Sequence, residues 1–214
     1  MRATRGNSRI SALAEAVARP AVPVDVAAAR AGLSMMTAAP AVIEDPSAWV
    51  CRFAPRIRAG GSVLDVACGG GRHARYLAAR GLAVLAADID AAALEGLAGI
   101  EGVQTLLADL EGAPSPFSGR QFDAVVVTRY LHRPLLGAMV DVLAPGGVLI
   151  YETFAAGNEQ FGRPRNPEFL LQPGELLELV RRRLRVIAFE DLYVELPKPA
   201  MVQRICAVRP AAGG

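Results

Sequence analysis

Three consecutive glycines at the end of an apolar segment constrain this chain more than any other feature. The stretch VLDVACGGGRHARYL, residues 63–77, reads as a buried strand, a bare turn at Gly69–Gly71 and a helix that begins at once. Glycine lacks a Cβ, so this turn can take positive φ angles and let a ligand approach the backbone closely. We therefore expect a strand–turn–helix unit with a ligand at the carboxyl end of the strand. A tight turn without a ligand is the alternative.

From residue 62 onward, segments of strand and helix character alternate along the chain. We expect strands over 62–68, 83–89, 103–110, 122–130 and 148–154, and helices over 72–80, 91–99 and 134–144. A helix over 175–183 and two strands, 184–194 and 200–209, close the chain. Such alternation is typical of the α/β class, in which a mostly parallel sheet carries helices on both faces.

The first part of the chain differs in composition from the rest. Residues 1–40 are rich in Ala and Arg and poor in acids, so we expect a disordered extension or a misassigned start, with a transit peptide as the alternative. A chain of 214 residues suits one core, and we expect a single domain over 41–210. It should open with a short helix that has Asp45 as its N-cap and Pro46 at its first position.

Composition limits the classes of partner. The chain has 23 Lys and Arg against 21 Asp and Glu, a formal net charge of +2, and their interspersion does not support a nucleic-acid surface. Its three cysteines are widely and irregularly spaced, which predicts neither a disulfide framework nor a metal site and suits a cytoplasmic protein. No segment reaches the roughly 20 apolar residues of a membrane span.

Two acids follow neighbouring predicted strands. Asp88 ends the second strand, where an acid binds the ribose hydroxyls of a nucleoside, and Asp109 ends the third, within reach of an adenine amine. An aspartate at such a junction can instead cap a helix, but Asp90 is better placed than Asp88 for that role. The two acids together favour a nucleoside ligand.

The residues after the glycines narrow the choice of nucleotide. No Lys followed by Ser or Thr is present, which excludes a P-loop. Gly69 and Gly71 match the first half of the dinucleotide pattern, with Ala74 in the third place. Arg72, in the first turn of the helix, suits a carboxylate such as that of a methionine moiety better than a pyrophosphate. These residues favour S-adenosylmethionine over NAD.

The segments VLDVACGGGRHARYLAARG, LAADID, LLADLE, FDAVVV and LAPGGVLI resemble, in order and spacing, the motifs of class I S-adenosylmethionine-dependent methyltransferases over about residues 61–153. The Arg directly after the glycines is similar to that of the small bacterial tellurite-resistance-type methyltransferases. The resemblance implies a Rossmann-like, doubly wound sheet of seven strands, mostly parallel, with an antiparallel last strand. It also implies S-adenosylmethionine as the cofactor.

The resemblance further implies roles for individual residues. Asp65 would steady the glycine loop, and Asp88 would bind the ribose. The cofactor would be lined by Gly69, Gly71, Asp109 and Leu110, while Arg72 and Arg129, the latter at the end of the fourth strand, are further candidates for contacts with it.

Methyl transfer depends mainly on alignment of the reactants, so a catalytic base is not obligatory. Weak candidates for such a base at the ends of the fourth and fifth strands are Tyr130, His132 and Glu152. The long segment 155–174 has no clear period and is expected to form a lid or substrate wall. The lid candidates are Asn158, Phe161 and Arg163; a solvated loop is the alternative.

The sequence thus predicts an S-adenosylmethionine-dependent methyltransferase, a monomer or homodimer, that acts on a small molecule. The expected acceptor is a metalloid oxyanion, a thiol or another soft nucleophile. Three alternatives stay open: methylation of RNA or protein, an adenosine-binding module without turnover, and an NAD-dependent oxidoreductase.

Overall fold

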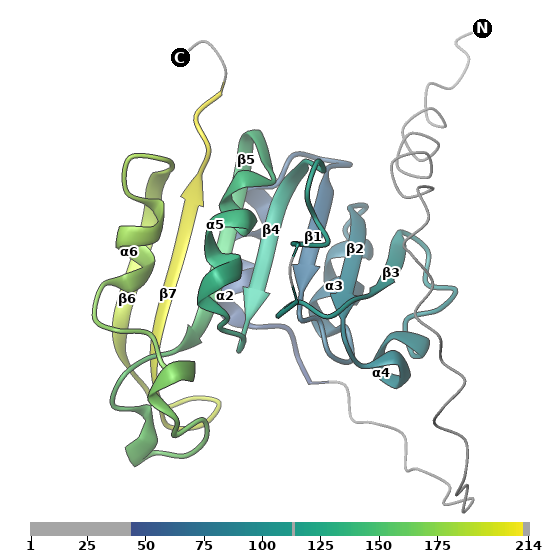
Figure 1. The fold of residues 1–214 in the computed structure, drawn as a ribbon. Helices are drawn as coiled ribbons and strands as arrows, with labels where there is room; N and C mark the ends of the chain where they lie inside the picture. The colour runs from purple at the N-terminus through teal and green to yellow at the C-terminus, as the bar shows by residue number, and fades with distance from the viewer. Residues whose placement is uncertain (1–43, 113, 212–214) are drawn as a thin grey trace, which may run out of the picture. The chain divides into compact units, whose positions relative to one another are not determined.

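The computed structural model describes residues 44–112 and 114–211, so the interpretation of residues 1–40 lies outside the described part. Seven strands form one sheet (Figure 1). They are β1 (Ser62–Val66), β2 (Ala83–Asp88), β3 (Val103–Leu107), β4 (Phe122–Thr128), β5 (Leu143–Phe154), β6 (Arg185–Val194) and β7 (Ala200–Val208).

The strand order is β3-β2-β1-β4-β5-β7-β6. Strands β1 to β5 are parallel to one another, and β7 is antiparallel to both β5 and β6. The predicted seven-stranded sheet with an antiparallel last strand is therefore confirmed. The order reverses between β1 and β4, which places a ligand crevice at the carboxyl ends of these two strands.

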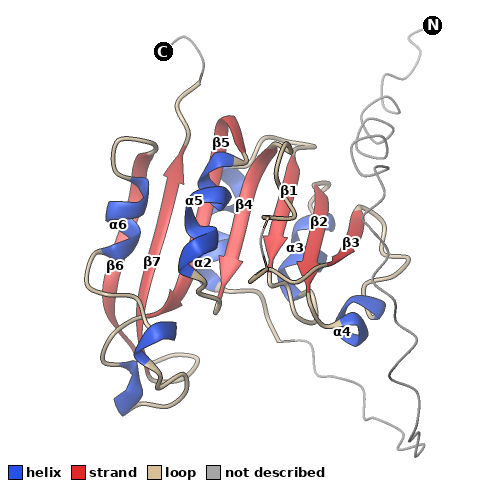
Figure 2. Ribbon diagram, in the orientation of Figure 1, coloured by secondary structure: helices blue, strands red, loops and turns tan. Residues whose placement is uncertain are grey.

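The helices cover both faces of the sheet (Figure 2), as predicted. They are α2 (Ala48–Phe53), α3 (Arg72–Ala78), α4 (Ala91–Glu95), α5 (Arg133–Asp141) and α6 (Glu175–Val180), with 3₁₀ turns at Ala54–Arg56, Asn158–Gln160 and Pro167–Phe169. None of the helices in the described part is long and apolar enough to cross a membrane.

Strand residues alternate between two hydrophobic cores because successive side chains point to opposite faces of a sheet. Val63 packs in the core that contains Trp49 and α3. Its neighbour Leu64 packs in the other core, with Met139 of α5 and Leu176 of α6. Both faces of the sheet are buried, which explains why the strands read as continuous apolar runs.

Several predicted boundaries are wrong. The segments predicted over 91–99, 103–110, 134–144 and 175–183 end earlier, at Glu95, Leu107, Asp141 and Val180. Two further differences, at α2 and β5, have a clear local cause. The N-cap of α2 is Ser47, whose hydroxyl accepts a 3.1 Å hydrogen bond from Trp49 N, and the predicted cap Asp45 and first residue Pro46 both lie before the helix. Strand β5 begins at Leu143, opposite Phe122, before the register shifts at a bulge. Pro145 to Gly147 therefore lie within the strand because the bulge accommodates them.

Candidate functional site

The glycine loop joins β1 to α3 with positive φ at Gly69 (51°) and Gly71 (73°), as predicted. A Cβ added to Gly69 or Gly70 would meet no atom of the described residues within 4 Å. A Cβ on Gly71 would lie 2.3 Å from Cδ2 of Leu97. The first two glycines therefore face open space, whereas Gly71 is needed for packing.

Asp88, half-buried at the end of β2, is tied to this loop. Its Oδ2 accepts a 2.7 Å hydrogen bond from Gly69 N, and its Oδ1 accepts one of 3.0 Å from Asp90 N. Asp90 caps α4 by accepting from the amides of Ala92 and Ala93, which confirms its predicted role. The carboxylate of Asp88 thus lies directly beside the open face of the loop.

Asp109 lies two residues beyond the end of β3 and is exposed. Its Oδ1 accepts a 2.9 Å hydrogen bond from Glu111 N, which fixes a turn there. The next residue, Leu110, is buried in the sheet core. Asp88 and Asp109 therefore end adjacent strands on the carboxyl edge of the sheet.

Asp65 lies under the loop, 1% exposed. Burial raises the pKa of its carboxyl group to about 7, although a backbone hydrogen bond from Ala74 and the charge of Arg72 act in the opposite direction. Its Oδ2 has no hydrogen-bond partner among the described residues. Asp65, a residue of β1, thus contacts α3 and keeps one carboxyl oxygen able to accept a hydrogen bond.

Arg72 and Arg129 share one carboxylate. Arg72 begins α3, and Arg129 follows β4 with a φ of 55°. Their Nη1 atoms lie 2.7 and 2.6 Å from Oε2 of Glu44. Hydrogen bonding and charge from Arg129 lower the pKa of Glu44. The two guanidinium groups therefore hold a carboxylate, the chemistry that the sequence suggested for Arg72, and sequence analysis did not identify Glu44.

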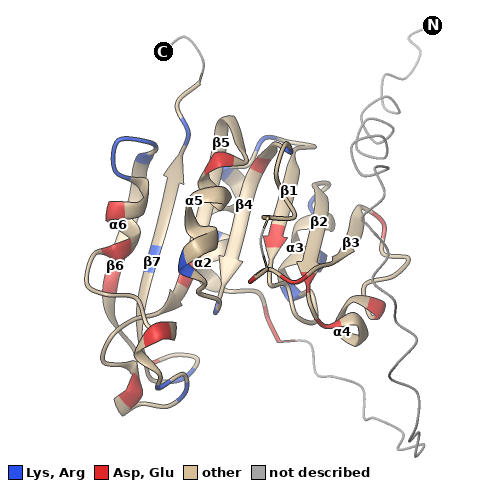
Figure 3. Ribbon diagram, in the orientation of Figure 1, with Lys and Arg blue, Asp and Glu red and all other residues tan. Residues whose placement is uncertain are grey.

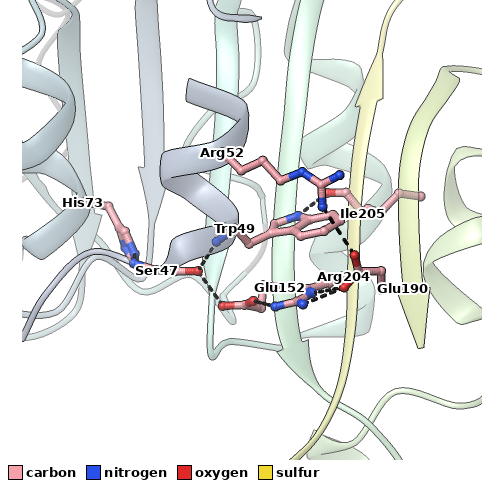
Figure 4. Close-up of polar contacts among 8 residues, drawn as sticks. All are labelled: Ser47, Trp49, Arg52, His73, Glu152, Glu190, Arg204 and Ile205. Atoms are coloured by element: carbon pink, nitrogen blue, oxygen red, sulfur yellow. Dashed lines mark hydrogen bonds and ion pairs between the residues drawn. The ribbon is translucent and has the colours of Figure 1, made fainter. Parts of the chain in front are cut away.

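His73 is buried and forms hydrogen bonds within the fold. Its Nε2 accepts a 3.1 Å hydrogen bond from Ser47 N, and its Nδ1 lies 3.3 Å from Oγ1 of Thr128 (Figure 4). Burial lowers the pKa of the ring to about 3. The neutral ring, with its proton on Nδ1, therefore joins α2 to the ends of the central strands.

Glu152, one of the candidate bases, belongs to a row of charges across three strands. Sheet register places it opposite Arg204, which in turn is opposite Glu190. Its Oε1 accepts from Ser47 Oγ at 2.7 Å and its Oε2 from Arg204 at 3.1 Å (Figure 4). The guanidinium of Arg204 also lies 4.8 Å from the centre of the Trp49 ring. Both carboxylate oxygens of Glu152 are thus engaged within the fold.

A pocket of about 210 Å³ opens at the carboxyl ends of β4 and β5. Its lining residues are Glu111, Arg129, Tyr130, Leu131, Thr153, Phe154, Pro164 and Phe169. Of the three candidate bases, Tyr130 lines this pocket, while His132 and Glu152 do not. Arg129 connects the pocket to the glycine loop through its shared carboxylate with Arg72.

The hydroxyl of Tyr130 is buried and has no hydrogen-bond partner among the described residues. Burial, with a smaller contribution from the charge of Glu111, raises its pKa to about 12. The phenol therefore stays protonated near neutral pH and is suited to donate a hydrogen bond rather than to remove a proton.

The long segment after β5 is held at several points. Asn158, 1% exposed, donates from Nδ2 to Pro164 O at 3.2 Å and accepts from Met201 N at 3.3 Å. Arg133 of α5 donates to the carbonyl oxygens of Glu168 and Leu170. Asn158 thus anchors the segment, and nothing in the sequence around Arg133 indicates its anchoring contacts.

The other two lid candidates lie apart from the pocket lining. The Phe161 ring packs against Tyr193, with centroids 5.1 Å apart, and Arg163 is exposed. The wall of the pocket is instead formed by Pro164 and Phe169. Neither residue was predictable from the sequence, because the segment lacks a period that would assign its side chains to a face.

Residues 63–147, from β1 into β5, match the family model of the methyltransferase domain. These residues form a methyltransferase domain. The match agrees with the resemblance of the sequence motifs to methyltransferases. The glycine loop, Asp88 and Asp109 all lie within the methyltransferase domain.

Solved structures support the same fold. TehB from Haemophilus influenzae superposes with a TM-score of 0.63 at 20% identity, and the alignment covers 75% of this chain and 61% of TehB. A TehB-like SAM-dependent methyltransferase from Corynebacterium glutamicum gives 0.54 at 20% identity, with 73% and 86% covered. This chain thus spans less than two thirds of the Haemophilus protein.

A third similar structure is the glycopeptide N-methyltransferase MtfA in complex with S-adenosyl-L-homocysteine. Its TM-score is 0.56 at 19% identity, with 78% of this chain and 91% of MtfA covered. At these identities the likenesses establish the fold of the methyltransferase domain. No curated protein matches the sequence significantly.

Proposed function

We propose that this chain transfers a methyl group from S-adenosylmethionine to a small molecule bound in the pocket at the ends of β4 and β5. The observation that carries this proposal is the position of Arg129. It lines the pocket and also shares a carboxylate with Arg72, which begins the helix after the glycine loop. An acceptor in the pocket would therefore be next to a cofactor on the loop.

The residues of the crevice fit the cofactor. Gly69 and Gly70 face open space, and the buried Oδ2 of Asp65 has no partner in the described part of the chain. Asp88 would hold the ribose, Asp109 and Leu110 would flank the adenine, and Arg72 would hold the methionine carboxylate. Bound there, the cofactor would supply an electrophilic methyl group, and its sulfur would keep the electron pair of the bond to that group.

The side chains of the pocket would act chiefly by positioning the acceptor. Oriented binding can contribute about 7–11 kcal/mol in favourable systems, and the apolar wall excludes water. Tyr130 would donate a hydrogen bond to the acceptor, because its hydroxyl is protonated and otherwise unpaired. A soft nucleophile such as a thiol or a metalloid oxyanion would need no protein base.

The cellular setting that we propose is the cytoplasm, with the protein a monomer or homodimer. The three cysteines are free, and Cys68 and Cys206 are buried. Burial raises the pKa of both thiols, so neither is suited to act as a nucleophile.

The test is transfer of a labelled methyl group from S-adenosylmethionine to pools of small thiols, metalloid oxyanions, total RNA and total protein. The proposal expects label in a small-molecule pool and no label in macromolecules. Label in RNA or protein would contradict it. Retention of the protein on a polyanion column that disappears with salt would point to RNA.

A further inference from the structure

The walls of the acceptor pocket are mainly apolar and aromatic. Tyr130, Phe154 and Phe169 contribute rings, and Leu131 and Pro164 contribute aliphatic surface. A small inorganic oxyanion would lose hydration against these walls without gaining enough hydrogen bonds in return. An aromatic ring would instead bury apolar area and pack against the three rings.

The described lining of this pocket carries one cation, Arg129, and one acid, Glu111. Arg129 pairs with Glu44 beside the pocket. The charges of Arg72 and Lys198 add to that of Arg129 in lowering the pKa of Glu44. The side chain of Glu44 is 57% exposed, so the pair with Arg129 is weak enough for a ligand to replace it. Figure 3 shows residues of both charges in the loops along the carboxyl edge of the sheet. An acceptor with an anionic group would therefore find a cation beside the apolar wall.

A polar group inside the pocket lining also lacks a partner. The Tyr130 hydroxyl is buried with no hydrogen bond among the described residues, and buried polar groups normally have one. Its protonated state leaves it able to donate to a sulfur or oxygen atom of a ligand. Thr153, 3% exposed, adds a second hydroxyl to the lining.

The size of the pocket limits the acceptor. Its volume of about 210 Å³ is below the roughly 300–1,000 Å³ typical of drug-sized ligand sites. One ring with two small substituents suits this volume better than a base within RNA or a residue within a protein.

We propose that the acceptor is a single-ring aromatic acid that carries a thiol nucleophile. This inference rests on the proposed methyl transfer and names its substrate class. The ring packs against Phe154 and Phe169, the acid group meets Arg129, and the nucleophile meets Tyr130. For a thiol, the proton leaves to solvent, the thiolate lone pair forms the new carbon–sulfur bond, and S-adenosylhomocysteine leaves with the electron pair of the broken bond.

The test compares acceptors that differ in one feature at a time. The probes are the three positional isomers of mercaptobenzoate, thiophenol as the aromatic thiol without an acid group, aliphatic mercaptoacetate and tellurite, each at saturating labelled S-adenosylmethionine. We expect kcat/KM for one mercaptobenzoate isomer to exceed that of every other class by at least about tenfold, the value of one charge-assisted hydrogen bond. Equal or better transfer to mercaptoacetate or tellurite would overturn the proposal.

Variants test the pocket directly. Phe169→Leu should raise KM for the preferred isomer several-fold, and Arg129→Gln should raise KM for that isomer but not for thiophenol. Tyr193→Leu is the matched control, since Tyr193 is 48% exposed against 47% for Phe169 but does not line the pocket. Equal effects of the Phe169 and Tyr193 variants would overturn the assignment of the wall.

Measurement of cofactor binding distinguishes a failure of the aromatic-acid proposal from a failure of the proposed function. If the protein binds S-adenosylmethionine but methylates none of the probes, the aromatic-acid proposal is overturned while the proposed function stands. If it does not bind the cofactor, both are overturned.

Discussion

At the scale of single residues, ion pairs hold the charged side chains of the site in place. Glu44 offers one carboxylate oxygen to both Arg72 and Arg129, and these arginines would otherwise repel each other. In the proposed complex, the carboxylate of the cofactor would pair with Arg72 in place of Glu44. We therefore regard Glu44 as a competitor for that position.

Glu44→Gln should tighten binding of S-adenosylmethionine, because the variant removes the competing charge. An exposed ion pair is worth up to about 1 kcal/mol, so the gain in affinity is at most about fivefold. Isothermal titration calorimetry measures it, with the exposed Glu101→Gln as the control. Weaker binding by the Glu44 variant would mean that Glu44 supports the site instead of competing for it.

The raised pKa of Asp65 leads us to expect that the free energy of unfolding depends on pH. In the folded protein its pKa of about 7 lies above the ordinary value of 3.8, so its contribution to stability is fully present below about pH 4 and is lost as the pH rises to about 7. Between pH 4.5 and 8, the wild type should lose on the order of 3 kcal/mol of unfolding free energy through this residue. Urea unfolding of wild type and Asp65→Asn at both pH values measures the difference. Parallel pH profiles for the two proteins would contradict this assignment.

At the scale of elements, the glycine loop must leave space for a ligand and also pack against the rest of the fold. The sequence alone does not show which glycine serves which purpose. Gly70 faces open space, whereas Gly71 has positive φ and lies against Leu97. The same residue type thus serves a ligand at one position and packing at the next.

Gly71→Ala should destabilise the fold by about 1–3 kcal/mol. The new Cβ collides with Leu97, and the backbone at this position has a positive φ that strains an alanine. Gly70→Ala should change unfolding free energy by less than about 1 kcal/mol but weaken cofactor binding, because its Cβ enters the open space. Denaturant unfolding and calorimetry on both variants separate the effects. A destabilised Gly70 variant with unchanged binding would contradict this division.

Ser47 links three elements. Its hydroxyl caps α2 and donates to Glu152 of β5, and its amide donates to His73 of α3. Ser47→Ala should cost about 1–2 kcal/mol of unfolding free energy, since the cap and a charge-assisted bond are both lost. Thermal unfolding measures the cost. Ser118→Ala, which removes one exposed local hydrogen bond, should have a smaller effect, and an equal effect would argue against the linking role.

At the scale of the whole molecule, the sequence predicted what local patterns determine. Apolar strands alternating with helices indicated the α/β class, and the motif order implied the antiparallel β7. Asp88 and Asp109 were placed correctly at adjacent strand ends because parallel strands bring their carboxyl ends to one edge. Glu44, Phe169 and the anchoring contacts of Arg133 were not predictable, since each depends on contacts between segments far apart in the chain.

The central claim is that the crevice between β1 and β4 binds S-adenosylmethionine. The most direct test is calorimetry with S-adenosylmethionine, S-adenosylhomocysteine and NAD on the wild type, Asp88→Asn and the control Asp90→Asn, which retains a helix cap. We predict micromolar binding of the two sulfur nucleosides, none of NAD, and an affinity loss of at least about tenfold only in the Asp88 variant. Binding of NAD alone, or of none of the three, would contradict the account.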